Sequence, residues 1–215
     1  AEARWLAKPV LDSRALPLDS DNVRLQGPGV MSFEKKHTIS GKGSIRLDVP
    51  TDGCRRHPSN RAFSVTTMMR LLPGENLERF NRISLWIHVD SPAIANNFME
   101  LSIHNQGKHI MPLPGRFEGT HTLGIPHGEW QHVVWEFPYV YRDFVTGISL
   151  SIHAHRTPVP APQGITVYVD NMCLEQVEAD HYKGFDLRAG AIAYCHSGYR
   201  PEAVKQAYAQ SGSGV

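Results

Sequence analysis

Twelve of the 215 residues are histidine, and several of them alternate with aliphatic residues along the chain. Such alternation is typical of a strand whose polar side chains face away from the aliphatic ones. The residues that share this outward position are Trp86, His88, Glu100, His104, Ser151, His153 and His155. If the strands that carry them belong to one sheet, we expect a single polar and aromatic surface.

Three kinds of chemistry fit this set. The first is a solvated or locally hydrogen-bonded sheet face. The second is a carbohydrate-binding surface, on which aromatic rings stack against sugar rings while His, Glu and Ser supply directed hydrogen bonds. The third is a zinc or nickel site, because neutral imidazole is a common metal ligand. Only His153 and His155 have a local spacing that suits a metal, with both rings on one face about 6.6 Å apart.

Catalytic signals are scarce in this chain. Glycoside hydrolysis needs two carboxylates roughly 5–9.5 Å apart across the sugar. Glu100 and Glu136 are the best-placed glutamates, and they could serve as acid and base only if their strands pair. A nucleophile elbow, a phosphate-binding loop and the His-Glu-x-x-His pattern are all missing from the sequence. We therefore expect that this chain is not itself catalytic, with a jelly-roll glycosidase or lyase as an alternative.

The composition of the chain argues against two classes of partner, nucleic acids and membranes. Lys and Arg number 22 and Asp and Glu number 21, which gives a net charge of +1. A nucleic-acid-binding protein needs a concentrated basic surface, so we expect no nucleic-acid partner. Hydrophobic residues make up 41% and charged residues 20%, and no run approaches the ~18 apolar residues of a membrane span. We accordingly expect neither a disordered tail nor a membrane protein.

The elements that must position the set are short strands. Seven segments predict strands, most of them by strict alternation: 44–49, 62–71, 82–89, 98–104, 130–137, 147–155 and 165–169. After the last segment the apolar phase shifts to Met172, Leu174 and Val177. Gly- and Pro-rich turn clusters separate the strands, and the one predicted helix is 201–209, opening at Pro201. This pattern predicts an all-β fold, an antiparallel β-sandwich.

The three cysteines, Cys54, Cys173 and Cys195, include no Cys-x-x-Cys pair, so they predict no zinc knuckle. Cys173 lies among apolar neighbours and is expected to be a buried free thiol. A disulfide between Cys54 and Cys195 is left open.

Three segments resemble carbohydrate-binding jelly-roll modules. Residues 39–47 look like the second strand of such modules, residues 81–87 like their central strand, and residues 166–174 like their closing strand. Together these segments frame most of residues 5–178. The resemblance implies a jelly-roll module of the galactose-binding type over residues 1–178.

The C-terminal part resembles something else. Residues 192–201 are similar to the first strand of the immunoglobulin-like domain that precedes the α/α barrel in family 9-type glycoside hydrolases. Gly198, Tyr199 and Pro201 match that strand, while Cys195 stands where the family has a polar residue. The resemblance implies a linker over 179–191, the start of an Ig-like domain with a flexible tail over 192–215, and a catalytic domain farther along the parent chain.

The resemblance also implies a function. We expect the non-catalytic N-terminal module of a secreted or periplasmic glycan-degrading enzyme, which binds a carbohydrate polymer or oligosaccharide on one sheet face. The alternative is a structural module that braces the catalytic barrel and binds no sugar. Asp12 and Asp170 resemble the place where many such modules hold a structural calcium ion, although one Asp at each end is few of the six to eight oxygens that calcium needs.

Overall fold

The computed structural model divides the chain into two units, Ala1–Glu178 and Ala179–Val215. The structure describes the following residues: 8–50, 55–56, 62–90, 98–108, 120–124, 126–137, 140–155, 164–178, 192–193 and 208–209. In the second unit, β13 (Ile192–Ala193) pairs antiparallel with β14 (Tyr208–Ala209). The predicted helix over 201–209 is therefore wrong at its end, and residues 201–207, like the expected linker 179–191, lie outside the described residues.

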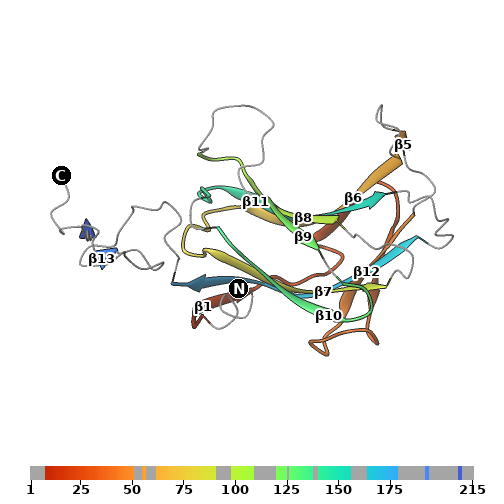
Figure 1. Cartoon of the computed structure of the whole chain (residues 1–215), viewed down its shortest axis with the longest axis horizontal. Coiled ribbons are helices and arrows are strands. Elements are labelled where there is room, and N and C mark those ends of the chain that lie inside the picture. The colour runs from red at the N-terminus through yellow and green to blue at the C-terminus, as the bar shows by residue number, and fades with distance from the viewer. Residues whose placement is uncertain are drawn as a thin grey trace, which may run out of the picture. The chain divides into compact units, whose positions relative to one another are not determined.

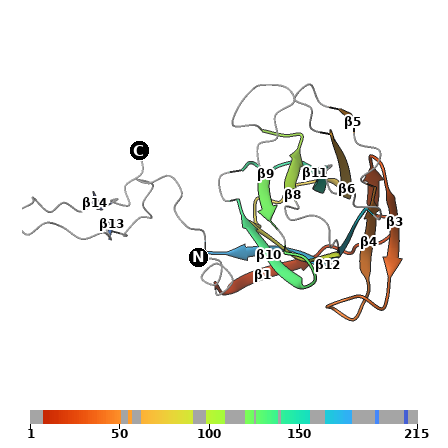
Figure 2. The ribbon, with the colours of Figure 1, turned by 45° about the vertical axis from the view of Figure 1, so that its right-hand side comes forward.

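The first unit contains two antiparallel sheets that lie one above the other (Figure 1). The first, sheet A, has the order β10-β7-β12-β4-β3, and β1 pairs with the last part of β12. Its strands are β1 (Val10–Ala15), β3 (Val30–Glu34), β4 (Ser44–Val49), β7 (Arg82–Asp90), β10 (Trp130–Glu136) and β12 (Ile165–Val177). Figure 2 shows β3 at the outer edge of this sheet, beside β4.

The second sheet, sheet B, has the order β2-β6-β11-β8-β9, and the short β5 pairs with β6. Its strands are β2 (Val23–Gln26), β5 (Arg55–Arg56), β6 (Ala62–Glu75), β8 (Phe98–Asn105), β9 (Thr120–Gly124) and β11 (Val145–His155). Every strand pairing within both sheets is antiparallel. The described residues hold no helix, so the predicted all-β antiparallel sandwich is confirmed.

The core lies between the sheets and consists of the aliphatic residues that alternate along each strand. Sheet A contributes Ile83, Leu85 and Ile87, and sheet B contributes Leu101 and Leu150, all of them fully buried. The predicted alternation in these segments is confirmed. Burial of such aliphatic side chains is the main term that stabilises a sandwich of this kind.

A β-bulge in β12 explains the shift in apolar phase. The register with β7 slips between Asp170 and Cys173, and Asn171 adopts the left-handed conformation with φ at 50°. The extra residue moves Met172 and Leu174 to the buried side, as the sequence predicts. Because of the bulge, β12 pairs with β4 before it and with β1 after it, along the same edge.

Cys173, next to the bulge, is a free and half-buried thiol, and burial is the largest cause that raises its pKa. Cys54 and Cys195 lie outside the described residues, so the possible disulfide between them stays a prediction.

The crossing from sheet B to sheet A depends on Gly27, which follows β2 at φ 94°. A Cβ at this position would collide with the carbonyl oxygen of Val65. Gly41 has a similar φ of 74°, but a Cβ there would meet nothing within 4 Å. We expect Gly41→Ala to lower the free energy of unfolding by about 1 kcal/mol, from backbone strain alone. Gly27→Ala should cost at least about 1 kcal/mol more, because overpacking is added to that strain.

Urea unfolding of the two variants beside the parent chain measures the difference. Equal losses in the two variants would contradict the close approach at Gly27.

Candidate functional site

The structure separates the outward-facing residues that the sequence predicts as one set. Trp86 and His88 lie on β7, in sheet A, while Glu100 and His104 lie on β8, in sheet B. Ser151, His153 and His155 lie on β11, which is also in sheet B. The two groups therefore face away from each other on opposite sides of the core, and the expected single surface does not form. The sequence could not decide this, because alternation gives the face of a strand but not its sheet.

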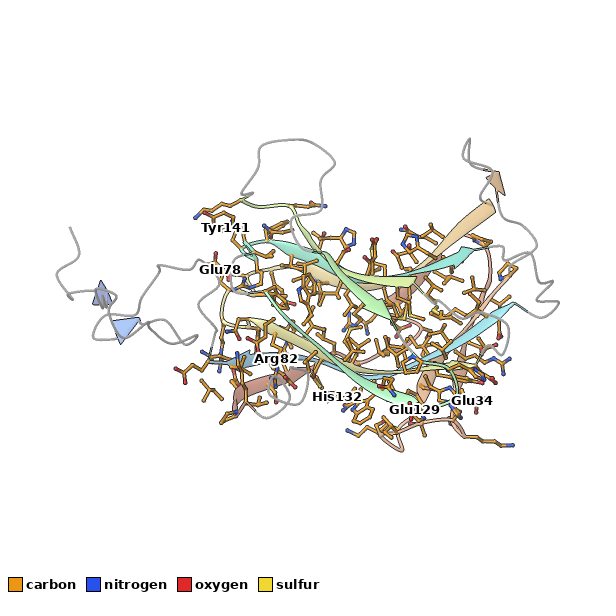
Figure 3. The ribbon with its side chains drawn as sticks, viewed as in Figure 1. Glu34, Glu78, Arg82, Glu129, His132 and Tyr141 are labelled. Atoms are coloured by element: carbon orange, nitrogen blue, oxygen red, sulfur yellow. The ribbon has the colours of Figure 1, made fainter. Side chains whose placement is uncertain are left out.

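On sheet A the outward rings pack against one another. Trp86 stacks on the exposed His132 of the neighbouring strand, with ring centroids 4.7 Å apart and planes within 18°. Figure 3 shows His132 projecting from β10 on the side away from sheet B. His37 stacks on Trp130 at 5.3 Å and meets the ring of His88 at 4.3 Å. Neighbouring imidazoles thus cover one side of both tryptophans.

The histidine at the centre of this ring cluster is poorly placed to carry charge. His88 is buried, and burial is the largest cause that lowers its pKa, followed by the neighbouring imidazole of His37. Sequence reasoning missed His37 because it lies in the turn between β3 and β4, where no alternation marks a face. The cluster contributes to packing on this side of the sheet.

The turn that carries His37 is held by Asp170. The carboxylate accepts hydrogen bonds from the Thr38 hydroxyl at 2.6 Å, from the backbone N–H groups of Ile39 and Ser40 at 2.8 and 2.9 Å, and from the Ser40 hydroxyl at 2.8 Å. Burial opposes ionisation of Asp170, but these hydrogen bonds outweigh it and lower the pKa of the carboxyl. The residue is thus a structural anchor.

The structure does not bring Asp12 and Asp170 together as calcium ligands. Asp12 is the cross-strand partner of Gln176, six residues farther along β12 than Asp170, which corresponds to about 20 Å. Asp12 instead forms an ion pair with Arg79. No cluster of three or more metal-binding side chains occurs within the described ranges.

The two glutamates considered as acid and base also lie apart. Glu100 is on β8 of sheet B and Glu136 on β10 of sheet A, so their strands do not pair. Glu136 is buried and accepts a hydrogen bond from Lys8 at 2.8 Å. This arrangement contradicts a glycosidase mechanism that uses these two carboxylates.

The outer face of sheet B carries a row of hydrogen-bonding residues that crosses the whole sheet. Direct cross-strand pairs link one polar residue from each of five strands. In order from edge to edge they are Gln26, Thr67, Ser151, Glu100 and Thr122. Four strand spacings of about 4.8 Å give this row, called the polar row below, a length of roughly 19 Å.

Contacts within the described part of the polar row hold its middle in place. The hydroxyls of Thr67 and Ser151 are 2.9 Å apart, and Nε2 of His153 lies 3.3 Å from a carboxylate oxygen of Glu100. Beside the row, Nε2 of His104 lies 2.8 Å from the hydroxyl of Ser149, and burial lowers the pKa of this imidazole. The side chains of Thr67, Ser151 and Glu100 are all partly open to solvent.

The sequence found only part of this row. Glu100 and Ser151 belong to the predicted set, while Gln26 and Thr67 do not, because the register between strands distant in sequence cannot be obtained from alternation. The backbone position of His155 opposite Phe63 places it two residues beyond His153 on β11, and its side chain lies outside the described residues.

The chain has a limited similarity to several solved structures. No protein-family model and no curated protein sequence matches the chain. Among solved structures, a family 30 carbohydrate-binding module of a cellulosomal cellulase from Clostridium thermocellum has a TM-score of 0.49 at 12% identity, covering 79% of this chain and 100% of the module. A family 11 carbohydrate-binding module from Clostridium thermocellum, solved with a β-1,3-1,4-mixed-linked tetrasaccharide, has a TM-score of 0.45 at 14% identity and coverages of 78% and 98%.

A third similar structure is an exo-β-agarase, with a TM-score of 0.47 at 16% identity; the match covers 79% of this chain but only 25% of the agarase. Within the described ranges, no helix has the length and hydropathy needed to cross a bilayer.

The anchoring role of Asp170 gives a test by pH. Because the folded-state pKa lies below that of the unfolded chain, the stabilisation is complete above the unfolded value of about 3.9 and is lost as the pH falls through the folded-state pKa. We expect Asp170→Asn to lower the free energy of unfolding by about 2 kcal/mol at pH 7 and by less in acid. Denaturant titrations at pH 7 and at pH 3 measure both losses.

Asp48→Asn is the matched control. Its half-exposed carboxylate pairs with Arg46 and accepts one hydrogen bond from the Thr166 hydroxyl at 2.7 Å, so we expect a smaller loss, of about 1 kcal/mol. A deficit of Asp170→Asn that stays constant from pH 7 to pH 3 would argue against the anchor.

Proposed function

We propose that this chain binds carbohydrate along the polar row on the outer face of sheet B. The observation that carries the proposal is the continuous cross-strand path from Gln26 to Thr122, which aligns one polar residue from each of five strands in the register of the sheet. Solvation of the sheet alone would not require this alignment, because polar residues scattered over the face would serve equally well. A straight line of about 19 Å suits an extended chain of sugar rings.

The side chains of the row suit sugar hydroxyls, each of which donates one hydrogen bond and accepts others. Glu100 is an acceptor for two hydroxyls, Thr67 and Ser151 both donate and accept, and the Gln26 amide does the same. The half-buried Met69 and Val65 lie on β6 on either side of Thr67 and offer apolar surface to the C–H faces of the rings. The ligand in this proposal is a neutral oligosaccharide or polysaccharide.

The wider setting rests on the resemblance of residues 192–201 to the first strand of an Ig-like domain. In this proposal the chain is a non-catalytic module of a secreted or periplasmic glycan-degrading enzyme, whose Ig-like and catalytic domains follow it. The polar row would hold the polymer near that enzyme.

A structural bracing role is the second candidate, and one observation favours it. Edge strand β3 and the turn after it expose the apolar side chains of Val30, Phe33 and Ile39. Exposed apolar residues beside an unpaired strand edge are typical of a surface that contacts another domain.

Affinity gel electrophoresis against a panel of soluble polysaccharides, followed by calorimetry with matching oligosaccharides, tests the first candidate. We expect binding to at least one neutral polysaccharide. Glu100→Gln should weaken it by about tenfold or more, because a hydrogen bond to a charged group contributes about 1.5–3 kcal/mol. Thr67→Ala should weaken it less, as the loss of a neutral hydrogen bond.

Trp86→Ala is the matched control, since it removes a large ring from the opposite face and should leave the affinity unchanged. Loss of binding in Trp86→Ala but not in Glu100→Gln would move the site to sheet A. Failure to bind any polysaccharide would favour the bracing role.

A further inference from the structure

Three arginines are buried among the described residues, and one of them lacks an adequate partner. Arg82, 2% exposed, is paired with Glu175 at 2.5 Å. Arg142, 6% exposed, also has an Nε without a partner, but its two Nη atoms donate to the backbone carbonyls of three residues. Arg70, 7% exposed, donates only to the carbonyl of Leu71, and its Nε has no partner.

A buried guanidinium in this state is costly, because its charge is removed from water without a contacting anion. Burial is the largest cause that lowers the pKa of Arg70, and the nearby charges are those of Asp19, Arg14 and Glu75. Glu75 pairs with Arg14 instead of Arg70, since both its oxygens accept hydrogen bonds from Arg14 at 2.7 and 2.9 Å. Asp19 accepts hydrogen bonds from Asn22 and Asp21. No carboxylate of the described residues contacts Arg70.

A cleft of about 590 Å³ opens beside this arginine. It lies between β1 of sheet A and the second half of β6 of sheet B, which belong to the two layers in Figure 1. Its lining includes Arg14, Leu16, Asn22, Arg70, Leu72 and Glu75. A cleft of this size holds a small molecule, and its mixed apolar and polar lining suits a ligand with both kinds of surface.

We propose that this cleft binds a sugar acid of about one ring, a hexuronate, whose carboxylate pairs with Arg70. The planar guanidinium matches a carboxylate in geometry and supplies the donors that the protein itself leaves unused. This cleft is separate from the polar row, and the proposal for the cleft does not depend on the function proposed for the polar row.

The other lining residues define the rest of the ligand. Asn22 donates its side-chain amide to Asp19 at 2.7 Å, which leaves its own carbonyl oxygen to accept from a sugar hydroxyl. Leu16 and Leu72 offer apolar surface to the C–H groups of a ring. Since Asp19 and Glu75 add negative charge nearby, a singly charged carboxylate fits the cleft better than a doubly charged phosphate.

Calorimetry of the full chain with sodium glucuronate and sodium galacturonate tests the proposal. The control ligands are glucose, which lacks the carboxylate, and acetate, which lacks the sugar ring. We expect at least one uronate to bind, and glucose and acetate each to bind at least tenfold more weakly. Arg70→Gln and the cleft-filling Leu72→Trp should each weaken uronate binding tenfold or more. Arg46→Gln, which removes a half-exposed positive charge from β4 of sheet A, and Glu100→Gln, in the polar row, should leave it unchanged.

Nuclear magnetic resonance of the unmutated chain keeps the test independent of whether those variants fold. The Nε–H signal of Arg70 and the amide signal of Leu72 should shift on addition of uronate. No shift at Arg70, equal binding of glucose, equal binding of acetate, or full affinity in a folded Arg70→Gln would each overturn the proposal. Because Glu100→Gln affects only the polar row, failure of one site is distinguishable from failure of the other.

Discussion

The sandwich depends on burying one face of each sheet against the other. Ile87 of sheet A and Leu150 of sheet B are fully buried, and the residues on either side of them along each strand must then point outward. The same constraint that builds the core therefore creates two outer faces. Successive side chains of a strand alternate between the two faces of its sheet, so the non-aliphatic residues lie on the outer faces. The outer face of sheet A carries the stacked rings, and that of sheet B carries the polar row.

Alternation in the sequence was sufficient to predict the antiparallel sandwich and the side chains that enter its core. The segments around Leu85, Leu101 and Leu150 each have a single period of two, and that period fixes which side chains enter the core. The phase shift at Met172 was also visible, and the bulge at Asn171 is its physical cause. These are local properties, which a single sequence contains.

The candidate site was predictable only in part, for a different physical reason. Trp86 and Ser151 have the same local pattern but lie in different sheets, and that assignment depends on pairing between strands far apart in sequence. Gln26 and Thr67 belong to the polar row only because the strand register aligns them with Ser151, and this register is not visible in the sequence. The position of Arg70 did leave a signal, because it follows Thr66 and Met68 in the inward phase of its strand, where a charged residue is out of place.

The polar positions of the chain thus differ in what they do for the fold. Asp170 and Arg142 use their hydrogen bonds to join segments of the protein to one another. Thr67 and Glu100 keep part of their hydrogen-bonding capacity open to solvent, and Arg70 keeps part of it unused beside a cleft. Hydrogen-bonding capacity that the protein itself does not use is available to a ligand.

The separation of the outer faces has a consequence for how the protein can change. Packed sheets lie about 10 Å apart, and side chains on the two outer faces are farther apart still. Substitutions at such distances combine additively in stability. The ring cluster on sheet A and the polar row on sheet B can therefore diverge independently, so that one scaffold can acquire a new specificity on one side while selection holds the other constant.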